Sequence, residues 1–326
     1  MAKLSYRWGI IGAGNIAASF VKGLNVLSNA RLYAVASRDG AKASSFADEY
    51  GFECSYGSYQ NMLDDPKVDV VYVATPNHLH YEHTMMALRS GKAVLCEKPF
   101  AVNCLQAKEM IDMSRSKGLF LMEALWSRFL PSVIEVKRLV ESGKIGNPMF
   151  LQAEFGIHPA YNPASRLFNP ELGGGSIPDI GIYPLFLALY LFGNPISVNV
   201  SSVPAPTGVD MTTSVVMRHR GGQMSVLTSS FAFDLTSDAK VTGDKGTLRL
   251  DRMFHMPTKL FFRPSIQEEE ILIPIDIIGN GYNYEAAEVM RCMDEGLTES
   301  GLWSHSDTLN LLRLVERVVN EAYSEN

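Results

Sequence analysis

The feature that most constrains the fold is a regular alternation of strand and helix patterns over residues 1–125. Short apolar runs predict strands at 8–11, 31–37, 68–74, 93–96 and 119–122, and helical patterns occupy 15–27, 41–50, 80–90 and 104–117. The run VDVVYVA at 68–74 is apolar almost throughout, which indicates a strand buried on both faces. Repeated units of this kind predict an α/β fold with a doubly wound parallel sheet.

After residue 125 the pattern changes. Alternating or β-rich stretches predict strands at 149–155, 197–203, 212–218, 224–233, 239–242, 247–250, 259–263 and 271–275, with helices at 130–141, 284–295 and 306–323. Short glycine turns between several of these strands favour hairpins and a mostly antiparallel sheet. We therefore predict two domains, 1–125 and 126–326, the second of the α+β class.

Composition narrows the classes of function. The formal charge of −6 argues against nucleic-acid binding, which normally shows a basic surface. No apolar run reaches the ~18 residues of a membrane span, and the N-terminus lacks the pattern of a signal peptide. The four cysteines show no paired spacing. We expect a cytoplasmic protein with no membrane or nucleic-acid partner.

The motif GAGNIA at 12–17 lies between the first strand and the first helix. Gly12 and Gly14 permit a tight turn, and the N–H groups of Asn15 and Ile16 open the helix, so the pyrophosphate of a dinucleotide can bind there. Ala17 takes the place of the third glycine, which only needs to be small. The alternative is an ordinary strand–helix turn.

The end of the second strand indicates which dinucleotide binds. NAD sites usually carry an acidic residue at this tip, where this chain has Ser37 followed by Arg38. An arginine can bind the 2′-phosphate of NADP, and Lys42 lies one helical turn further on. We therefore predict NADP, with NAD as an alternative. Asp39 could instead hold Arg38 in a local pair, or Arg38 could simply be solvated.

The third strand ends in the sequence ATPNHLH. Because ligands of a parallel sheet lie beyond the carboxyl ends of its strands, this segment should border the cofactor. The cofactor-binding residues predicted here are Ala74, Thr75, Pro76, Asn77 and His80. His78, His80 and His83 raise the question of a metal, but no third ligand has a convincing spacing, so we expect none.

The sequence CEKPF at 96–100 ends another strand of the same sheet. Lys98 therefore points toward the cofactor, where an amine is costly unless it is paired or used. We predict that Lys98 holds a substrate oxygen and that Glu97 lies beside the cofactor. The alternative is a surface pair between Lys98 and Glu97.

A glycine-rich loop at 173–175 leads into a helix that carries Asp179 and Tyr183. The i, i+4 spacing should place both side chains on one face. Tyrosine becomes a base near neutral pH only if its pKa falls from ~10, and a nearby ammonium such as that of Lys98 can lower it. Tyr183 is the predicted base, with packing of the helix as the alternative.

Taken together, GxGxxA, TPNxxH, EKP and GGGxxxDxGxY resemble the glucose–fructose oxidoreductase/inositol dehydrogenase/MocA family over nearly the whole chain. The segment EALWSRF at 123–129 and Tyr183 are most similar to the branch of dimeric dihydrodiol dehydrogenase and NADP-dependent D-xylose dehydrogenase. Many members of the family, including inositol dehydrogenases, have histidine at the position of Tyr183, so the tyrosine argues against the inositol branch.

The resemblance implies an N-terminal Rossmann domain and a C-terminal domain with a large open sheet that often forms the interface of a homodimer or homotetramer. It implies Lys98 and Tyr183 as the catalytic pair, oriented or charged by Asp179, and a cis Lys98–Pro99 bond. It also implies that Trp126 and Arg128 line the cofactor or substrate cleft.

Three functions follow for such a chain. The first is an NADP-dependent oxidoreductase acting on a sugar, polyol or cyclic diol, with residues 155–168 shaping the substrate pocket. The second is a non-catalytic dinucleotide-binding regulator, and the third is an NAD-dependent glycosidase.

Overall fold

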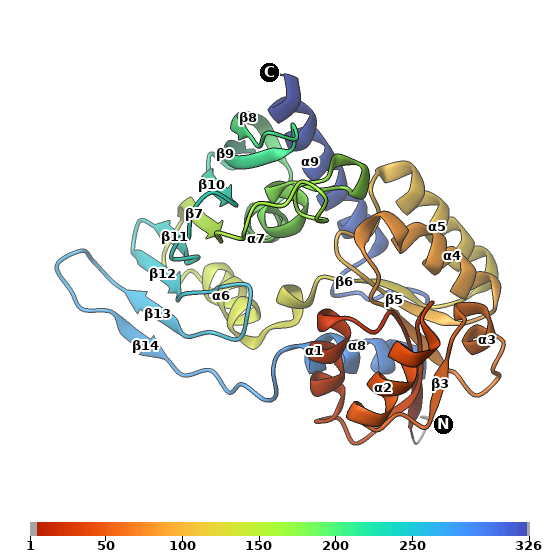
Figure 1. The fold of residues 1–326 in the computed structure, drawn as a ribbon. Coiled ribbons are helices and arrows are strands. Elements are labelled where there is room, and N and C mark those ends of the chain that lie inside the picture. Colours follow the sequence, from red (N-terminus) through yellow and green to blue (C-terminus); the bar gives the residue numbers. More distant parts are fainter. Residues whose placement is uncertain (1–4, 325–326) are drawn as a thin grey trace. The chain divides into compact units, whose positions relative to one another are not determined.

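The computed structural model describes residues 5–324 and divides the chain into two compact units (Figure 1). Unit 1 comprises Met1–Trp126 and Ile278–Leu309, and unit 2 comprises Ser127–Ile277 and Asn310–Asn326. Residues 1–4 and 325–326, which the predicted domains include, lie outside the described residues.

Unit 1 contains a six-stranded sheet, and all its strand pairs are parallel. In the order of the sheet, its strands are β3 (Cys54–Tyr56), β2 (Ala30–Ala36), β1 (Tyr6–Ile11), β4 (Val70–Val73), β5 (Ala93–Glu97) and β6 (Leu121–Ala124). Every residue of β4 and β5 is buried, as expected of a sheet covered on both faces. The predicted Rossmann arrangement is confirmed.

The helices between these strands are α1 (Asn15–Leu24), α2 (Gly40–Tyr50), α3 (Tyr59–Leu63), α4 (His80–Arg89) and α5 (Cys104–Lys117). Local signals start and stop them. Asp39 accepts hydrogen bonds from the N–H groups of Ala41 and Lys42, which begins α2, and Gly51 ends it with a φ of 80°. The short elements β3 and α3 were not predicted, because neither is long enough to show a period.

The predicted second domain, 126–326, needs one correction, because Ile278–Leu309 belongs to unit 1. This segment carries α8 (Tyr282–Asp294), which packs beside α1. The Tyr282 ring stacks on Trp126 with ring centroids 4.2 Å apart, and Trp303 Nε1 donates to Glu123 Oε2 over 3.0 Å. These side chains complete the core of unit 1, so the chain returns to it. The last helix, α9 (His305–Ser324), begins in this segment and ends in unit 2.

Unit 2 contains an eight-stranded sheet. In the order of the sheet, its strands are β14 (Ile271–Ile273), β13 (Leu260–Arg263), β12 (Gly246–Leu250), β11 (Ala239–Gly243), β7 (Pro148–Gly156), β10 (Met224–Ser230), β9 (Asp210–His219) and β8 (Pro195–Pro204). The pair β7–β10 is parallel and the other pairs are antiparallel, which confirms the mostly antiparallel sheet. Strand β10 ends at Ser230 rather than at 233, because its partner β7 ends at Gly156, opposite Ser230.

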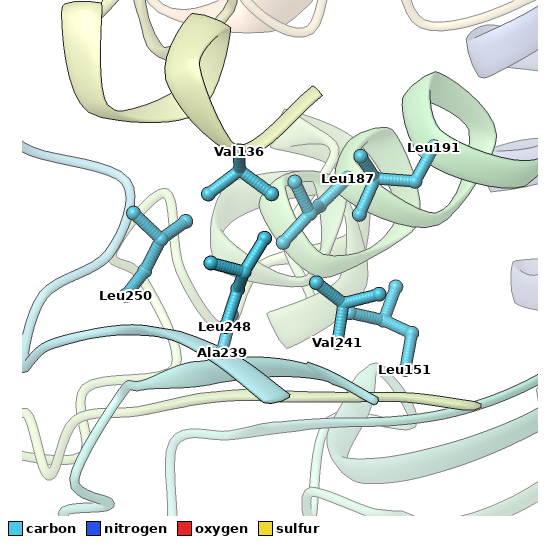
Figure 2. A pocket seen from close by; sticks show the side chains of 8 residues that line it. All are labelled: Val136, Leu151, Leu187, Leu191, Ala239, Val241, Leu248 and Leu250. Atoms are coloured by element: carbon cyan, nitrogen blue, oxygen red, sulfur yellow. The ribbon is translucent and has the colours of Figure 1, made fainter. Parts of the chain in front are cut away.

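Helices α6 (Pro131–Glu141) and α7 (Ile182–Phe192) pack against one face of this sheet. Figure 2 shows the apolar side chains that meet there, Val136 from α6, Leu187 and Leu191 from α7, and Leu151, Ala239, Val241, Leu248 and Leu250 from the strands. No polar group lines this space, so it is part of the core and unsuited to a hydroxylated ligand.

The helical stretch Pro170–Phe192, which contains α7, is the one stretch within residues 5–324 that is long and apolar enough to cross a membrane. However, 72% of its most apolar window is buried inside the structure. Its apolar character is therefore accounted for by its place in the core of unit 2.

The side chains on the opposite face of the sheet can be identified from their alternation along each strand. Leu151 points to the helices, so its neighbour Gln152 points away and is exposed. Leu227 lies near α7, so Val226 and its cross-strand partner Val216 also point away. This face therefore mixes polar and apolar side chains.

Candidate functional site

In unit 1 the turn between β1 and α1 has the geometry that the motif predicted. Gly12 has a φ of 102°, and a Cβ there would lie 3.0 Å from the carbonyl oxygen of Ala74, at the end of β4. At Gly14 a Cβ would meet nothing within 4 Å, so the backbone borders open space. No side chain in the described structure caps α1, and its first turn has no acidic residue. The N–H groups of Asn15 and Ile16 are thus available to an anion.

The tip of β2 has no carboxylate directed at a ribose. Ser37 is buried, its N–H donates to the Tyr56 carbonyl over 3.1 Å, and its Oγ accepts from the N–H of Asp39. The Asp39 carboxylate caps α2, at 3.0 Å from Ala41 N and 3.2 Å from Lys42 N. Arg38 and Lys42 are both exposed at this helix start. The Asp39 carboxylate caps α2, and this argues against the alternative that Asp39 holds Arg38 in a local ion pair.

The exit of β4 lies against the start of α4. Ala74 and Thr75 are buried, and Pro76 leads into a single 3₁₀ turn, Asn77–Leu79. Thr75 Oγ1 lies 2.9 Å from His83 Nδ1. Burial lowers the pKa of His83, Glu82 raises it, and Arg38 lowers it, which places the Arg38 charge near this loop. The tip of β2 and the exit of β4 thus border one region.

His80 joins two of the predicted loops. Its side chain is 1% exposed, with Nε2 2.7 Å from the Thr75 carbonyl oxygen and Nδ1 2.8 Å from the Pro99 carbonyl oxygen. Burial lowers the pKa of His80 to about 4. Within residues 5–324, no group of three or more His, Cys, Asp or Glu side chains could hold a metal ion. His80 therefore holds the exits of β4 and β5 together, while its contact with a cofactor stays a prediction.

Two buried carboxylates, those of Glu97 and Glu123, hold the backbone of the segment that follows β5. Glu97 is 6% exposed; Tyr72 donates its hydroxyl to Glu97 Oε1, and the Lys98 N–H donates to Oε2 over 3.1 Å. The Lys98–Pro99 bond is cis, and the next N–H, of Phe100, donates to Glu123 Oε1 over 3.1 Å. Glu97 is thus buried in the core, and its predicted place beside the cofactor stays a prediction.

Trp126 and Arg128, the two residues of the segment EALWSRF that were predicted to line the cleft, are largely buried. Trp126 is 5% exposed and stacks on Tyr282 in unit 1. Arg128 is 8% exposed and belongs to unit 2, where its guanidinium lies 4.4 Å above the Tyr190 ring. Their predicted place beside a ligand stays a prediction.

The predicted base lies in unit 2 at the start of α7. Residues Ile177–Gly181 form a π-helical turn that continues into α7, so Asp179 and Tyr183 do not follow the α-helical register that was predicted for them. Asp179 Oδ1 accepts from Arg166 Nη1 over 2.8 Å. π-Helical turns inside helices are frequent at functional sites.

Aromatic rings surround Tyr183, which is 5% exposed. Its ring centroid lies 4.8 Å from that of His255 and 5.9 Å from that of Phe155. Ser127 Oγ donates to the His255 carbonyl over 2.7 Å and holds this loop. The sequence did not predict His255 or Arg166, because both lie in loops with no periodic pattern. Arg166 lies within residues 155–168, which were predicted to shape the substrate pocket.

Comparison with protein families supports this organisation. Residues 6–125 match the family described as "Oxidoreductase family, NAD-binding Rossmann fold", and residues 133–249 match the "GFO/IDH/MocA C-terminal domain".

Similar proteins extend over the full chain. The trans-1,2-dihydrobenzene-1,2-diol dehydrogenase of Danio rerio is 34% identical over 334 residues, covering 99% of each chain. The enzyme of the same name from Homo sapiens is 34% identical over 323 residues, covering 97% of this chain and 96% of the relative. Each dihydrodiol dehydrogenase thus matches both units.

Solved structures with a similar fold include two with 26% identity. The aldose-aldose oxidoreductase of Caulobacter crescentus has a TM-score of 0.90, covering 99% of this chain and 98% of its own. A 3-ketoreductase of Actinomadura kijaniata in complex with NADP has a TM-score of 0.85, covering 98% of each chain. A levoglucosan dehydrogenase in complex with NADH, 22% identical with a TM-score of 0.86, covers 99% of this chain and 98% of its own and shares the fold.

Proposed function

Because the chain belongs to the Gfo/Idh/MocA oxidoreductase family, as its motifs predicted, we propose that it oxidises or reduces a sugar or a cyclic diol with NADP. The chain is an NAD(P)-dependent dehydrogenase or reductase that acts on CH–OH groups. The observation that carries the proposal is the similarity to dihydrodiol dehydrogenases over 99% of both chains.

The residues of unit 1 fit a dinucleotide. Gly12 allows the turn to pass close to β4, Gly14 borders open space, and the first N–H groups of α1 are uncapped by side chains. The choice of NADP rests on the exposed Arg38 and Lys42, which would hold the 2′-phosphate. NADP, when bound, supplies the nicotinamide carbon that exchanges a hydride with the substrate.

We assign the acid–base chemistry to Tyr183, Lys98 and Asp179. The phenolate oxygen of Tyr183 accepts the proton of the substrate hydroxyl during oxidation, and the resulting Tyr183 hydroxyl returns a proton to the substrate oxygen during reduction. The ammonium of Lys98 stabilises negative charge on the substrate oxygen and on the tyrosine oxygen. Asp179, oriented by Arg166, contributes to the charge and orientation of this site.

The test is a matched pair of variants on α7. Tyr183→Phe removes only the hydroxyl, so the ring still packs against His255 and turnover should fall about 10²- to 10⁴-fold. Tyr190→Phe removes a hydroxyl from the same helix and should retain turnover. NADP binding, followed by fluorescence titration of NADPH, should be unchanged in both.

The partner role is tested by a double-mutant cycle. Lys98→Met should lower turnover by a factor similar to that of Tyr183→Phe, and the double variant should be little worse than the worse single one. Additive losses would show that the two residues act independently.

The assay also separates the other functions. Stoichiometric reduction of NADP by trans-1,2-dihydrobenzene-1,2-diol or an aldose indicates a dehydrogenase. Binding of NADP without turnover of any sugar or diol would favour a regulator, and cleavage of a glycoside without net change of the cofactor would favour a glycosidase. If Tyr183→Phe keeps more than about a tenth of the turnover, the assigned base is wrong.

A further inference from the structure

A buried polar cluster lies next to the π-helical turn of unit 2. Asp210, the first residue of β9, is 1% exposed, and its Oδ2 accepts two hydrogen bonds. One comes from Ser176 Oγ over 2.8 Å and the other from the N–H of Ile177 over 2.7 Å. Ser176 Oγ also lies 2.9 Å from Ser229 Oγ on β10. One carboxyl group therefore ties the beginning of the turn to the sheet.

The second oxygen of this carboxyl group is in an unusual position. Asp210 Oδ1 is buried and has no hydrogen-bond partner in the described structure. It lies against Gly175, whose φ is 130° and where a Cβ would be only 2.2 Å from Oδ1. Burial raises the pKa of Asp210 to about 7, while its bonds to Ile177 and Ser176 lower it. Keeping an acid here costs stability, so a reason for it is expected.

The cluster binds the first residue of the π-helical turn and lies close to its last residue. Asp210 binds Ile177 at its first residue, and at its last residue, Gly181, a Cβ would lie 2.9 Å from Ser229 Oγ. Asp179 lies inside the turn, and Tyr183 follows it in the first turn of α7. Because side chains on a helix rotate with its backbone, a displaced turn would redirect both residues.

We propose that Asp210 is a positioning residue for the reaction, which sets the rotation of the turn and thereby the direction of Asp179 and Tyr183. The inference rests on the proposed function of Tyr183. It assigns to Asp210 the role of a hydrogen-bond acceptor, and the acceptor is its Oδ2 atom. A neutral side chain with the same oxygen should therefore serve equally well.

The surroundings of Asp210 agree with an acceptor that does not need its charge. The titratable group that faces it from α9 is Tyr323, whose pKa is raised to about 12 by burial and by the charge of Asp210. The largest influences on the pKa of Asp210 are burial, which raises it, and hydrogen bonds, which lower it. The partners are the hydroxyl of Ser176 and the backbone N–H of Ile177.

The experiment compares Asp210→Ala, which removes the acceptor, with Asp210→Asn, which keeps it. In the full-length protein we expect Asp210→Ala to lower kcat about 10- to 100-fold, because small misplacements of reacting groups have effects of this size. The KM and the affinity for NADP should stay within a factor of about three, since Asp210 belongs to unit 2 and the dinucleotide turn belongs to unit 1. Asp210→Asn should restore kcat to within a factor of about three.

A control separates positioning from loss of stability. Ser225→Ala removes a buried hydroxyl from β10, the strand that also carries Ser229. Ser225 Oγ lies 2.9 Å from His219 Nε2, and its removal should leave kcat unchanged. Hydrogen exchange of the backbone N–H groups of residues 177 and 179–181 should accelerate in Asp210→Ala and stay slow in Asp210→Asn. If Asp210→Ala does not fold, Ser176→Ala, which removes one of the two bonds to Oδ2, should show the same acceleration and a smaller loss of kcat.

Two results would overturn the proposal. One is a folded Asp210→Ala enzyme with normal kcat, and the other is an Asp210→Asn enzyme as impaired as Asp210→Ala, since the charge would then matter instead of the acceptor. If Tyr183→Phe is also fully active, the proposed function has failed. If Tyr183→Phe is impaired and Asp210→Ala is not, only the positioning role has failed.

Discussion

Replacing Gly175 by alanine tests the packing that holds the π-helical turn. The new Cβ would lie 2.2 Å from Asp210 Oδ1, well inside the distance of any ordinary contact, and the backbone φ of 130° disfavours every residue except glycine. The carboxyl group of Asp210 must therefore move, and it cannot move without stretching its bonds to Ser176 and Ile177.

The expected loss of stability has two parts. A backbone conformation of this kind costs about 1–3 kcal/mol for a residue with a Cβ. Weakening two hydrogen bonds to a buried carboxyl group adds about 1–3 kcal/mol. We expect Gly175→Ala to lower the free energy of unfolding by about 3–5 kcal/mol, the middle of the range given by these two contributions.

Urea unfolding followed by two probes measures this loss. All three tryptophans, Trp8, Trp126 and Trp303, lie in unit 1, so their fluorescence reports on that unit, while far-UV circular dichroism reports on both. Gly208→Ala is the matched control, because Gly208 is also in unit 2, has a φ of 89° and has nothing within 4 Å of an added Cβ. It should cost about 1–2 kcal/mol.

The difference in free energy of unfolding between Gly175→Ala and Gly208→Ala measures the effect of the contact with Asp210. A Gly175→Ala protein no less stable than Gly208→Ala would show that the carboxyl group accommodates a methyl group, and the reasoning about the cluster would be wrong. A loss seen by circular dichroism with little change in the tryptophan transition would place the damage in unit 2, as expected.

Three further predictions concern the cofactor, the assembly and pH. Arg38→Ala should raise the KM for NADP by about one to two orders of magnitude, because it removes a charge-assisted contact that contributes ~1.5–3 kcal/mol, and it should leave the KM for NAD nearly unaffected. Equal increases of KM for the two cofactors would contradict a 2′-phosphate site. The face of the unit 2 sheet that carries Gln152, Val216 and Val226 should be buried in a homodimer or homotetramer, so a monomer by light scattering at micromolar concentration would contradict it. Burial raises the pKa of Glu123 from 4.5 to about 7, so its contribution to stability is present below pH 4.5 and is lost as pH rises through 7. Glu123→Gln should remove about 3 kcal/mol of that pH dependence, and urea midpoints that decline equally in both proteins from pH 5 to 8 would contradict it.

Local patterns in the sequence determined the architecture of unit 1 and the candidate residues at its strand ends. The buried run that became β4 and the glycines of the β1–α1 turn are signals carried by neighbouring residues, so they can be read without the fold. The motifs around Lys98 and Tyr183 identified the family for the same reason.

Contacts between distant parts of the chain decided the rest. Tyr282 returns to stack on Trp126, Asp210 reaches Ile177, and His255 packs on Tyr183, although no spacing in the sequence links these pairs. The parallel pairing of β7 with β10 cannot be predicted from the sequence either, because the alternation of side chains along a strand does not specify its partner. Such contacts depend on which buried surfaces fit together, and that is decided only when the whole chain packs.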